Sequence, residues 1–126
     1  MSFEELFERL EMLQGRDKYT GQERRKFARL VYPPSKRPIL KIKNCELEVI
    51  DVSERGMKLF NYMQHKLDYK ILGTVFFPSG MSIEINGEIA WQYKNEIGLF
   101  NTRIPRFIIE EEIATLLKHY LKTKFF

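Results

Sequence analysis

The sequence has little of what catalytic and metal sites usually require. It contains one cysteine and two histidines, and His65 and His119 both lie outside any recognisable catalytic or zinc-binding motif. A glycine-rich phosphate loop and a dinucleotide-binding fingerprint are also missing. A single cysteine cannot form an internal disulfide. We therefore expect a binding protein rather than an enzyme, with no metal and no resident cofactor.

Long hydrophobic runs are absent as well. No apolar stretch approaches the roughly 18 residues that a membrane-spanning helix needs. The first residues, MSFEELFERLEML, are acidic and lack a small-residue cleavage site, so they do not resemble an export signal. These features predict a soluble, cytoplasmic protein without a membrane span. The length of 126 residues fits one ordinary globular domain.

The positive charge of the chain is confined to one segment. Residues 1–14 carry a net charge of −3, residues 15–43 carry +8 and residues 44–126 carry −1. The densest part is the stretch GQERRKFARLVYPP, residues 21–34, where four cationic side chains lie within six residues. Such a block is either a solvated surface or a binding site for an anion.

Apolar residues at helical spacing mark both ends of the chain. Those near the N-terminus predict a short amphipathic helix that ends at Gly15, and those near the C-terminus predict a second helix: Phe3, Leu6, Phe7, Leu10 and Leu13, then Ile109, Ile113, Leu116, Leu117 and Tyr120. A short helix is marginal by itself in water, so the first one must dock on its own domain, a second copy or another protein. Residues 15–37 show no periodicity and are expected to lack regular structure.

Six short β-like runs separate the two helices, at residues 38–43, 45–52, 56–60, 71–78, 82–93 and 96–101. In the fifth run, Ile83, Ile85, Ile89 and Trp91 alternate with polar residues across Asn86-Gly87. We therefore predict one long strand there rather than a hairpin, with Gly87 at a bulge or at a close backbone approach. Pro78-Ser79-Gly80 is the better turn. Six such runs predict a mainly β fold, an antiparallel barrel or sandwich.

Two short patterns are candidates for binding chemistry. In RRKFAR, Arg25 and Arg29 stand four residues apart; in DVSERG, an aspartate, a serine and a glycine follow a strand. Each pattern is common alone, since Asp and Ser also close turns and Gly takes positive φ. Guanidinium groups bind phosphate oxygens and the O6/N7 edge of guanine, and a carboxylate accepts hydrogen bonds from guanine N1–H and N2–H₂. A ligand with phosphates and guanines would use both patterns.

In these patterns the sequence resembles the PilZ domain, a family whose members bind the bacterial second messenger cyclic di-GMP. The resemblance rests on RRKFAR, on DVSERG, and on GEIAW followed by IGLF, which are similar to the family's late strands; it covers roughly residues 20–120. It implies a six-stranded antiparallel β-barrel with a C-terminal helix. The additional short N-terminal helix lies outside the resemblance. We divide the chain into this helix, residues 1–17, and a barrel domain with its C-terminal helix, residues 18–126.

The resemblance also implies roles for individual residues. Arg25 and Arg29 would grip phosphate and the guanine edge, and Asp51 and Ser53 would hold the base or sugar. Gly56 would let the backbone approach the ligand. Trp91 is expected near a base, although a tryptophan on an alternating strand is more often part of the core. Arg24 supplies a further guanidinium, which we expect to favour an intercalated pair of dinucleotides over a single one.

The implied mechanism is a receptor that passes ligand binding to a protein partner. We expect mutually repelling cations to keep residues 18–34 mobile until the dinucleotide orders them and re-aims the N-terminal helix. The partner would read this change through that helix or the barrel surface. Two other functions stay open: a ligand-independent adaptor, and a small basic module for single-stranded nucleic acid, which is less favoured because few aromatics interleave with the basic block. Self-association into a homodimer also stays open.

Overall fold

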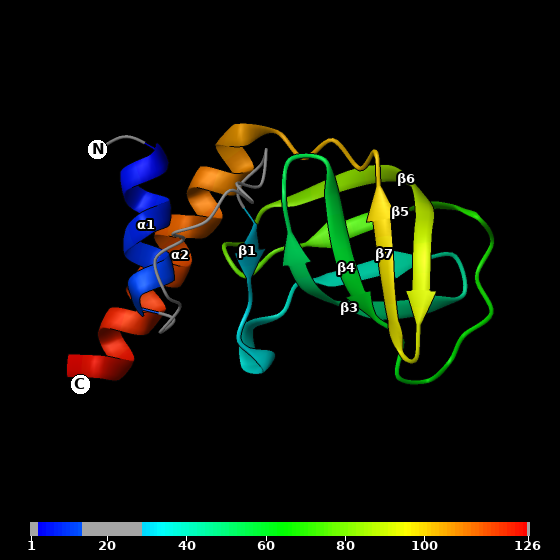
Figure 1. The fold of residues 1–126 in the computed structure, drawn as a ribbon, viewed down its shortest axis with the longest axis horizontal. Coiled ribbons are helices and arrows are strands. Elements are labelled where there is room, and N and C mark those ends of the chain that lie inside the picture. The colour runs from blue at the N-terminus through cyan, green and yellow to red at the C-terminus, as the bar shows by residue number, and fades with distance from the viewer. Residues whose placement is uncertain (1–2, 14–28, 126) are drawn as a thin grey trace.

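The computed structural model of the protein describes residues 3–13 and 29–125, and it shows a mainly β architecture (Figure 1). Six strands form the barrel: β2 (Ile39–Ile42), β3 (Cys45–Val52), β4 (Gly56–Phe60), β5 (Lys70–Phe76), β6 (Ser82–Tyr93) and β7 (Glu96–Phe100). They pair antiparallel in the order β3-β2-β5-β6-β7-β4, and β4 pairs back with β3 to close the barrel. The predicted fold is confirmed, and each of the six β-like runs forms a strand.

One further strand lies outside the closed barrel. β1 (Leu30–Val31) pairs with the end of β3, where Leu30 lies opposite Val52 and Val31 opposite Asp51. It is followed by a short 3-10 helix, η1 (Pro34–Lys36). The expectation that residues 15–37 lack regular structure is therefore wrong for these two elements. Two residues are too few to show a periodicity, and Pro34 fits the start of a helical turn because its missing N–H needs no partner there.

Two β-bulges change which side chains face outward, and the first is in β3. Val49 lies opposite Leu59, and both are buried in the core. The next pair is Asp51 opposite Lys58, so Ile50 is an extra residue in the ladder. Because side chains alternate between the two faces of a strand, one extra residue turns those that follow to the other face. Asp51 therefore lies on the outer face of the barrel beside Lys58.

The second bulge lies in β6. Ile89 lies opposite Leu99, and the next pair is Trp91 opposite Gly98, so Ala90 is the extra residue. β6 is one long strand, as predicted, and it stays in register at Gly87, where a Cβ would lie 3.2 Å from the backbone carbonyl oxygen of Phe100. The close backbone approach at Gly87 is thus confirmed. The expected alternation that placed Trp91 on the same face as Ile89 is wrong, because the bulge at Ala90 reverses it.

Two helices complete the fold. α1 (Phe3–Leu13) and α2 (Arg106–Phe125) lie side by side at one end of the barrel, with β1 between them and the other strands (Figure 1). Leu10 of α1 has no exposed surface and belongs to the same core as α2 and the barrel. The apolar face of α1 therefore docks on its own domain. The boundary at residue 17 stays a prediction, since residues 14–28 lie outside the described part of the chain. No helix in that part is long and apolar enough to cross a membrane.

Candidate functional site

The DVSERG segment forms the tight turn between β3 and β4, and Ser53 closes it. The Ser53 N–H donates to the Gly56 carbonyl at 2.8 Å, and the Gly56 N–H donates to Ser53 Oγ at 3.2 Å. The Ser53 hydroxyl also lies 3.3 Å from the Gly56 carbonyl oxygen. The side chain of Ser53 is buried, so its first role in this structure is to hold the turn.

Gly56 is required by packing within the barrel. A Cβ on this residue would lie 2.6 Å from the carbonyl oxygen of Leu99 on β7, a distance at which the backbone must move. Its conformation is not the reason for a glycine here, because among the described glycines only Gly80 has a positive φ. The explanation of Gly56 as a left-handed turn residue is therefore wrong. Its missing side chain lets two strands approach each other.

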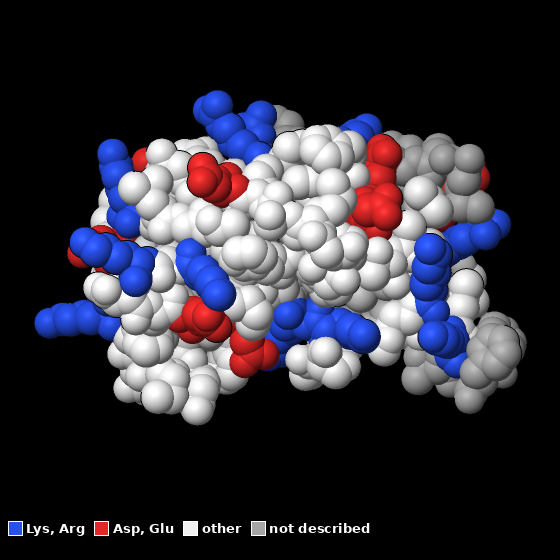
Figure 2. Space-filling model, turned by 180° about the vertical axis from the view of Figure 1, so that it is seen from behind, with Lys and Arg blue, Asp and Glu red and all other residues white. Residues whose placement is uncertain are grey.

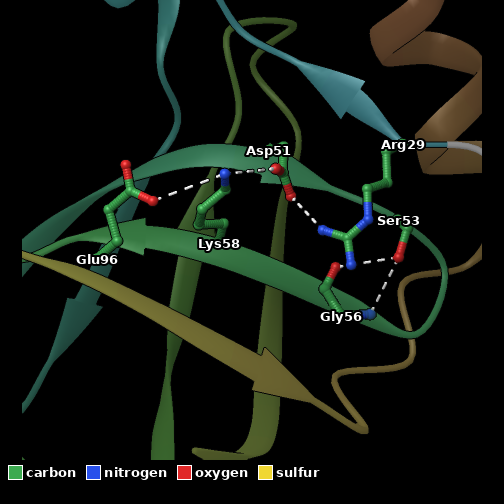
Figure 3. Close-up of polar contacts among 6 residues, drawn as sticks. All are labelled: Arg29, Asp51, Ser53, Gly56, Lys58 and Glu96. Carbon is green, nitrogen blue, oxygen red and sulfur yellow. Dashed lines mark hydrogen bonds and ion pairs between the residues drawn. The ribbon is translucent and has the colours of Figure 1, made fainter. Parts of the chain in front are cut away.

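The two sequence patterns meet at a single ion pair. Arg29 Nη1 donates to Asp51 Oδ1 at 2.8 Å, across 22 residues of sequence (Figure 3). Arg29 precedes β1, and the pairing of β1 with β3 brings it next to the outward-turned Asp51. Asp51 is 4% exposed, whereas the side chain of Arg29 is 37% exposed. The guanidinium thus reaches solvent while it satisfies the carboxylate. Arg24 and Arg25 lie outside the described residues.

Two charged residues of this site were missed by the sequence analysis. Lys58 Nζ lies 3.8 Å from Asp51 Oδ2 and 3.7 Å from Glu96 Oε1, and so extends the ion pair to four alternating charges (Figure 3). Lys58 is on β4 opposite Asp51, and Glu96 begins β7. The bulge in β3 is what places Lys58 and Asp51 together, and no signal in the sequence marks that bulge.

Trp91 lies on the outer face of the barrel with its side chain over β7. It is 45% exposed, and a Cβ on Gly98 would overlap its indole ring. Gly98 lies opposite both Trp91 and Lys58 in the strand register. The exposed indole is therefore available for stacking in the same row of the barrel as Lys58. The role of Gly98, which leaves room for this ring, was not apparent from the sequence.

A second polar cluster holds the segment that follows Arg29. The Tyr32 hydroxyl donates to Glu112 Oε1 of α2 at 2.7 Å, and the backbone N–H of Ser79 donates to Glu112 Oε2 at 3.3 Å. Burial raises the pKa of Glu112, while the hydrogen bonds from Ser79 and Tyr32 lower it in part. Burial and the adjacent carboxylate also raise the pKa of Tyr32. This cluster ties β1, the β5–β6 turn and α2 together.

The outward-facing charges can bind an anion that also presents hydrogen-bond donors. Arg29 and Lys58 supply the cations and Asp51 supplies the acceptor. Guanine and phosphate match such a set, because guanidinium groups bind phosphate bidentately and carboxylates accept from the donor edge of guanine. Among the described residues there is no group of three or more side chains that could hold a metal ion. The fold is thus a closed barrel with this set of charges on the outer face beside the β3–β4 turn.

Comparison with known proteins identifies the family. The protein-family model described as "PilZ domain" matches residues 23–121, which is most of the chain, so this chain belongs to the PilZ domain family. PilZ domains form a family of cyclic di-GMP-binding receptors, which are binding modules. No curated protein matches the chain.

Among solved structures, the crystal structure of an uncharacterized Legionella protein is similar, with a TM-score of 0.50 and 16% identity. The alignment covers 76% of this chain and 95% of that one. At this identity the likeness shows the fold alone, and that fold agrees with the barrel described above.

Proposed function

We propose that this protein is a cyclic di-GMP receptor and that the basic loop before β1 closes over the dinucleotide against the turn between β3 and β4. The observation that carries the proposal is the 2.8 Å contact between Arg29 and Asp51, which joins the two motif halves at one rim. The guanidinium of Arg29 exchanges Asp51 for ligand phosphate and guanine, and Arg25 joins it. Arg24 adds a third guanidinium that favours an intercalated pair of dinucleotides.

The barrel side of the proposed site presents the remaining groups. Asp51 accepts hydrogen bonds from the guanine edge, with Ser53 beside it at the base or sugar. Gly56 lets the turn pack close to β7, and the backbone of this turn approaches the ligand. Trp91, which is exposed in the same row, stacks near a base. The messenger itself is the ligand, and the receptor acts in the cytoplasm without a resident cofactor or catalysis.

Removal of either motif arginine should weaken the binding of cyclic di-GMP by about ten- to a hundredfold, because a charge-assisted hydrogen bond contributes about 1.5–3 kcal/mol. Isothermal titration of Arg25→Ala and Arg29→Ala against the parent measures this change and the stoichiometry. Arg9→Ala on the exposed side of α1 removes the same charge elsewhere and should bind like the parent. If both motif variants also bind like the parent, the proposed site is wrong.

Binding should also be transmitted to α1, which packs on α2 at the end of the barrel where β1 lies. We expect the dinucleotide to increase hydrogen-exchange protection in residues 18–34 and to change it in residues 3–13. A partner protein then distinguishes the two states through α1 or the barrel surface. Mass spectrometry of exchange with and without cyclic di-GMP measures this, and unchanged protection in both segments contradicts the mechanism.

The two alternative functions give different results in the same assays. A nucleic-acid module would bind random single-stranded oligonucleotides with a steep salt dependence. On the face shown in Figure 2, the Lys and Arg side chains of the described residues lie in separate groups, some at the outline and some within the face, and they do not form one continuous stripe. A ligand-independent adaptor would capture the same proteins with and without the dinucleotide. Saturable binding of one or two dinucleotides per chain favours the receptor over both.

A further inference from the structure

Lys58 occupies the middle of the proposed ligand surface, although neither motif includes it. The strand register places Asp51, Lys58, Gly98 and Trp91 in one row across β3, β4, β7 and β6. Neighbouring strands lie about 4.8 Å apart, so the row from Asp51 to Trp91 spans roughly 14 Å. Gly98 contributes no side chain. A ligand that contacts both Asp51 and Trp91 must therefore pass over Lys58.

The charge of Lys58 also matters for a ligand with two negative charges. Asp51 and Glu96 both carry carboxylates on this face, and each would repel phosphate. The Lys58 ammonium lies between them, at 3.8 Å and 3.7 Å, and its side chain is 30% exposed. Among the four residues of this row, Lys58 carries the positive charge, and Arg29 adds a second cation next to Asp51. Both distances exceed ordinary hydrogen-bond lengths, so the ammonium can turn toward a phosphate oxygen without breaking a short bond.

We propose that Lys58 binds a phosphate of the dinucleotide and that Glu96 competes with that phosphate for the Lys58 ammonium. Glu96 thereby lowers the affinity of the receptor for its messenger. The Glu96 carboxylate is half-exposed and contacts Lys58 across the β4–β7 pair. In the strand register Glu96 lies opposite Phe60, two residues along β4 from Lys58. The proposal rests on the proposed function, because it requires cyclic di-GMP to bind at this rim.

Opposite changes in affinity test the proposal. In titrations with cyclic di-GMP, Lys58→Met should weaken binding by about tenfold, since it removes one charge-assisted contact. Glu96→Gln should tighten binding by about two- to fivefold, the range expected for loss of an exposed ion pair. A phosphate contact also predicts that Lys58→Met lowers the slope of log K against log salt concentration, because one charge that attracts the ligand is lost. The affinity and the slope are both read from the same titrations.

A second ion pair on the barrel supplies matched controls. Lys41 on β2 lies 3.5 Å from Glu46 on β3, and both side chains are exposed. Lys41→Met and Glu46→Gln therefore change the same charges on the same kind of strand pair, and both should leave binding unchanged. Thermal unfolding of each variant checks the fold. If Lys58→Met does not fold, the half-exposed Glu96→Gln still tests the competition.

The outcomes distinguish failure of the Lys58 and Glu96 inference from failure of the proposed function. If the parent binds and Arg29→Ala weakens that binding, but Lys58→Met binds like the parent, this inference is overturned and the proposed function stands. An unchanged salt slope in Lys58→Met overturns the phosphate contact, and unchanged affinity in Glu96→Gln overturns the competition. If the parent does not bind cyclic di-GMP, the proposed function itself fails.

Discussion

Two buried carboxylates, Asp51 and Glu112, are satisfied in different ways. Asp51 is 4% exposed and its partners are the cationic side chains of Arg29 and Lys58, which reach solvent. Glu112 has no exposed surface, and its partners are the buried Tyr32 hydroxyl and a backbone N–H. Both carboxylates hold the same short segment, residues 29–32, from opposite ends.

The difference shows which end of the segment can respond to a ligand. Arg29 can leave Asp51 for another anion because its guanidinium reaches solvent and Lys58 remains beside the carboxylate. The Tyr32 hydroxyl cannot leave Glu112 without losing a hydrogen bond in a place that water does not reach, which costs about 1–3 kcal/mol. The segment therefore has an exchangeable end at the rim and a fixed end against α2. In the proposed mechanism, a change at the rim reaches the helices through this fixed end.

The largest expected effect is a difference between the two carboxylates in how much each contributes to the free energy of unfolding. Glu112→Ala should lower the free energy of unfolding by about 2–4 kcal/mol, because it leaves the Tyr32 hydroxyl without a partner and creates a cavity. Asp51→Ala should cost only about 1 kcal/mol, since Arg29 and Lys58 can turn to solvent. Urea unfolding of both variants measures the difference. Equal losses would show that the distinction between the two sites is false.

Tyr32→Phe sharpens the same comparison. It removes one hydrogen bond and keeps the ring, so its cost should lie below that of Glu112→Ala, and cyclic di-GMP affinity should stay within about twofold of the parent. Tyr62→Phe, at an exposed tyrosine after β4, is the control for loss of a hydroxyl. A large loss of affinity in Tyr32→Phe at unchanged stability would place Tyr32 in the ligand site instead.

The barrel could be predicted from the sequence because its signal is local. Alternating apolar residues and turn residues identified all six barrel strands, and helical spacing identified α1 and α2. β1 was missed because two residues show no periodicity and form a strand only by pairing with β3. Its existence depends on residues 20 or more positions away.

The site could be predicted only as far as its motifs extend. Asp51, Ser53 and Gly56 lie at the β3–β4 turn as expected, although Ser53 and Gly56 have structural roles there. Lys58 and Glu96 were missed because their place beside Asp51 follows from strand register and from the extra residue at Ile50. A bulge turns every later residue of its strand to the other face. The sequence alone does not show where two residues of one strand lie opposite a single residue of the next.

The smallest expected effect concerns the pH dependence of stability and distinguishes Glu112 from its neighbours on α2. Burial raises the pKa of Glu112 above its ordinary value of 4.5. The folded protein therefore keeps a proton on Glu112 at pH values where the unfolded chain has released it. The stability contributed by this proton is present below that ordinary pKa, and it is lost as pH rises through the folded pKa.

Glu112→Gln should remove this pH dependence, because an amide does not titrate. As pH rises from about 4 toward neutrality, the unfolding free energy of the parent should therefore fall relative to that of Glu112→Gln. Urea unfolding across this range measures the change, with the exposed Glu110→Gln on the same helix as the control. If the Glu112→Gln and Glu110→Gln curves have the same pH dependence, Glu112 is not the titrating group. The fixed end of the segment would then be held independently of pH.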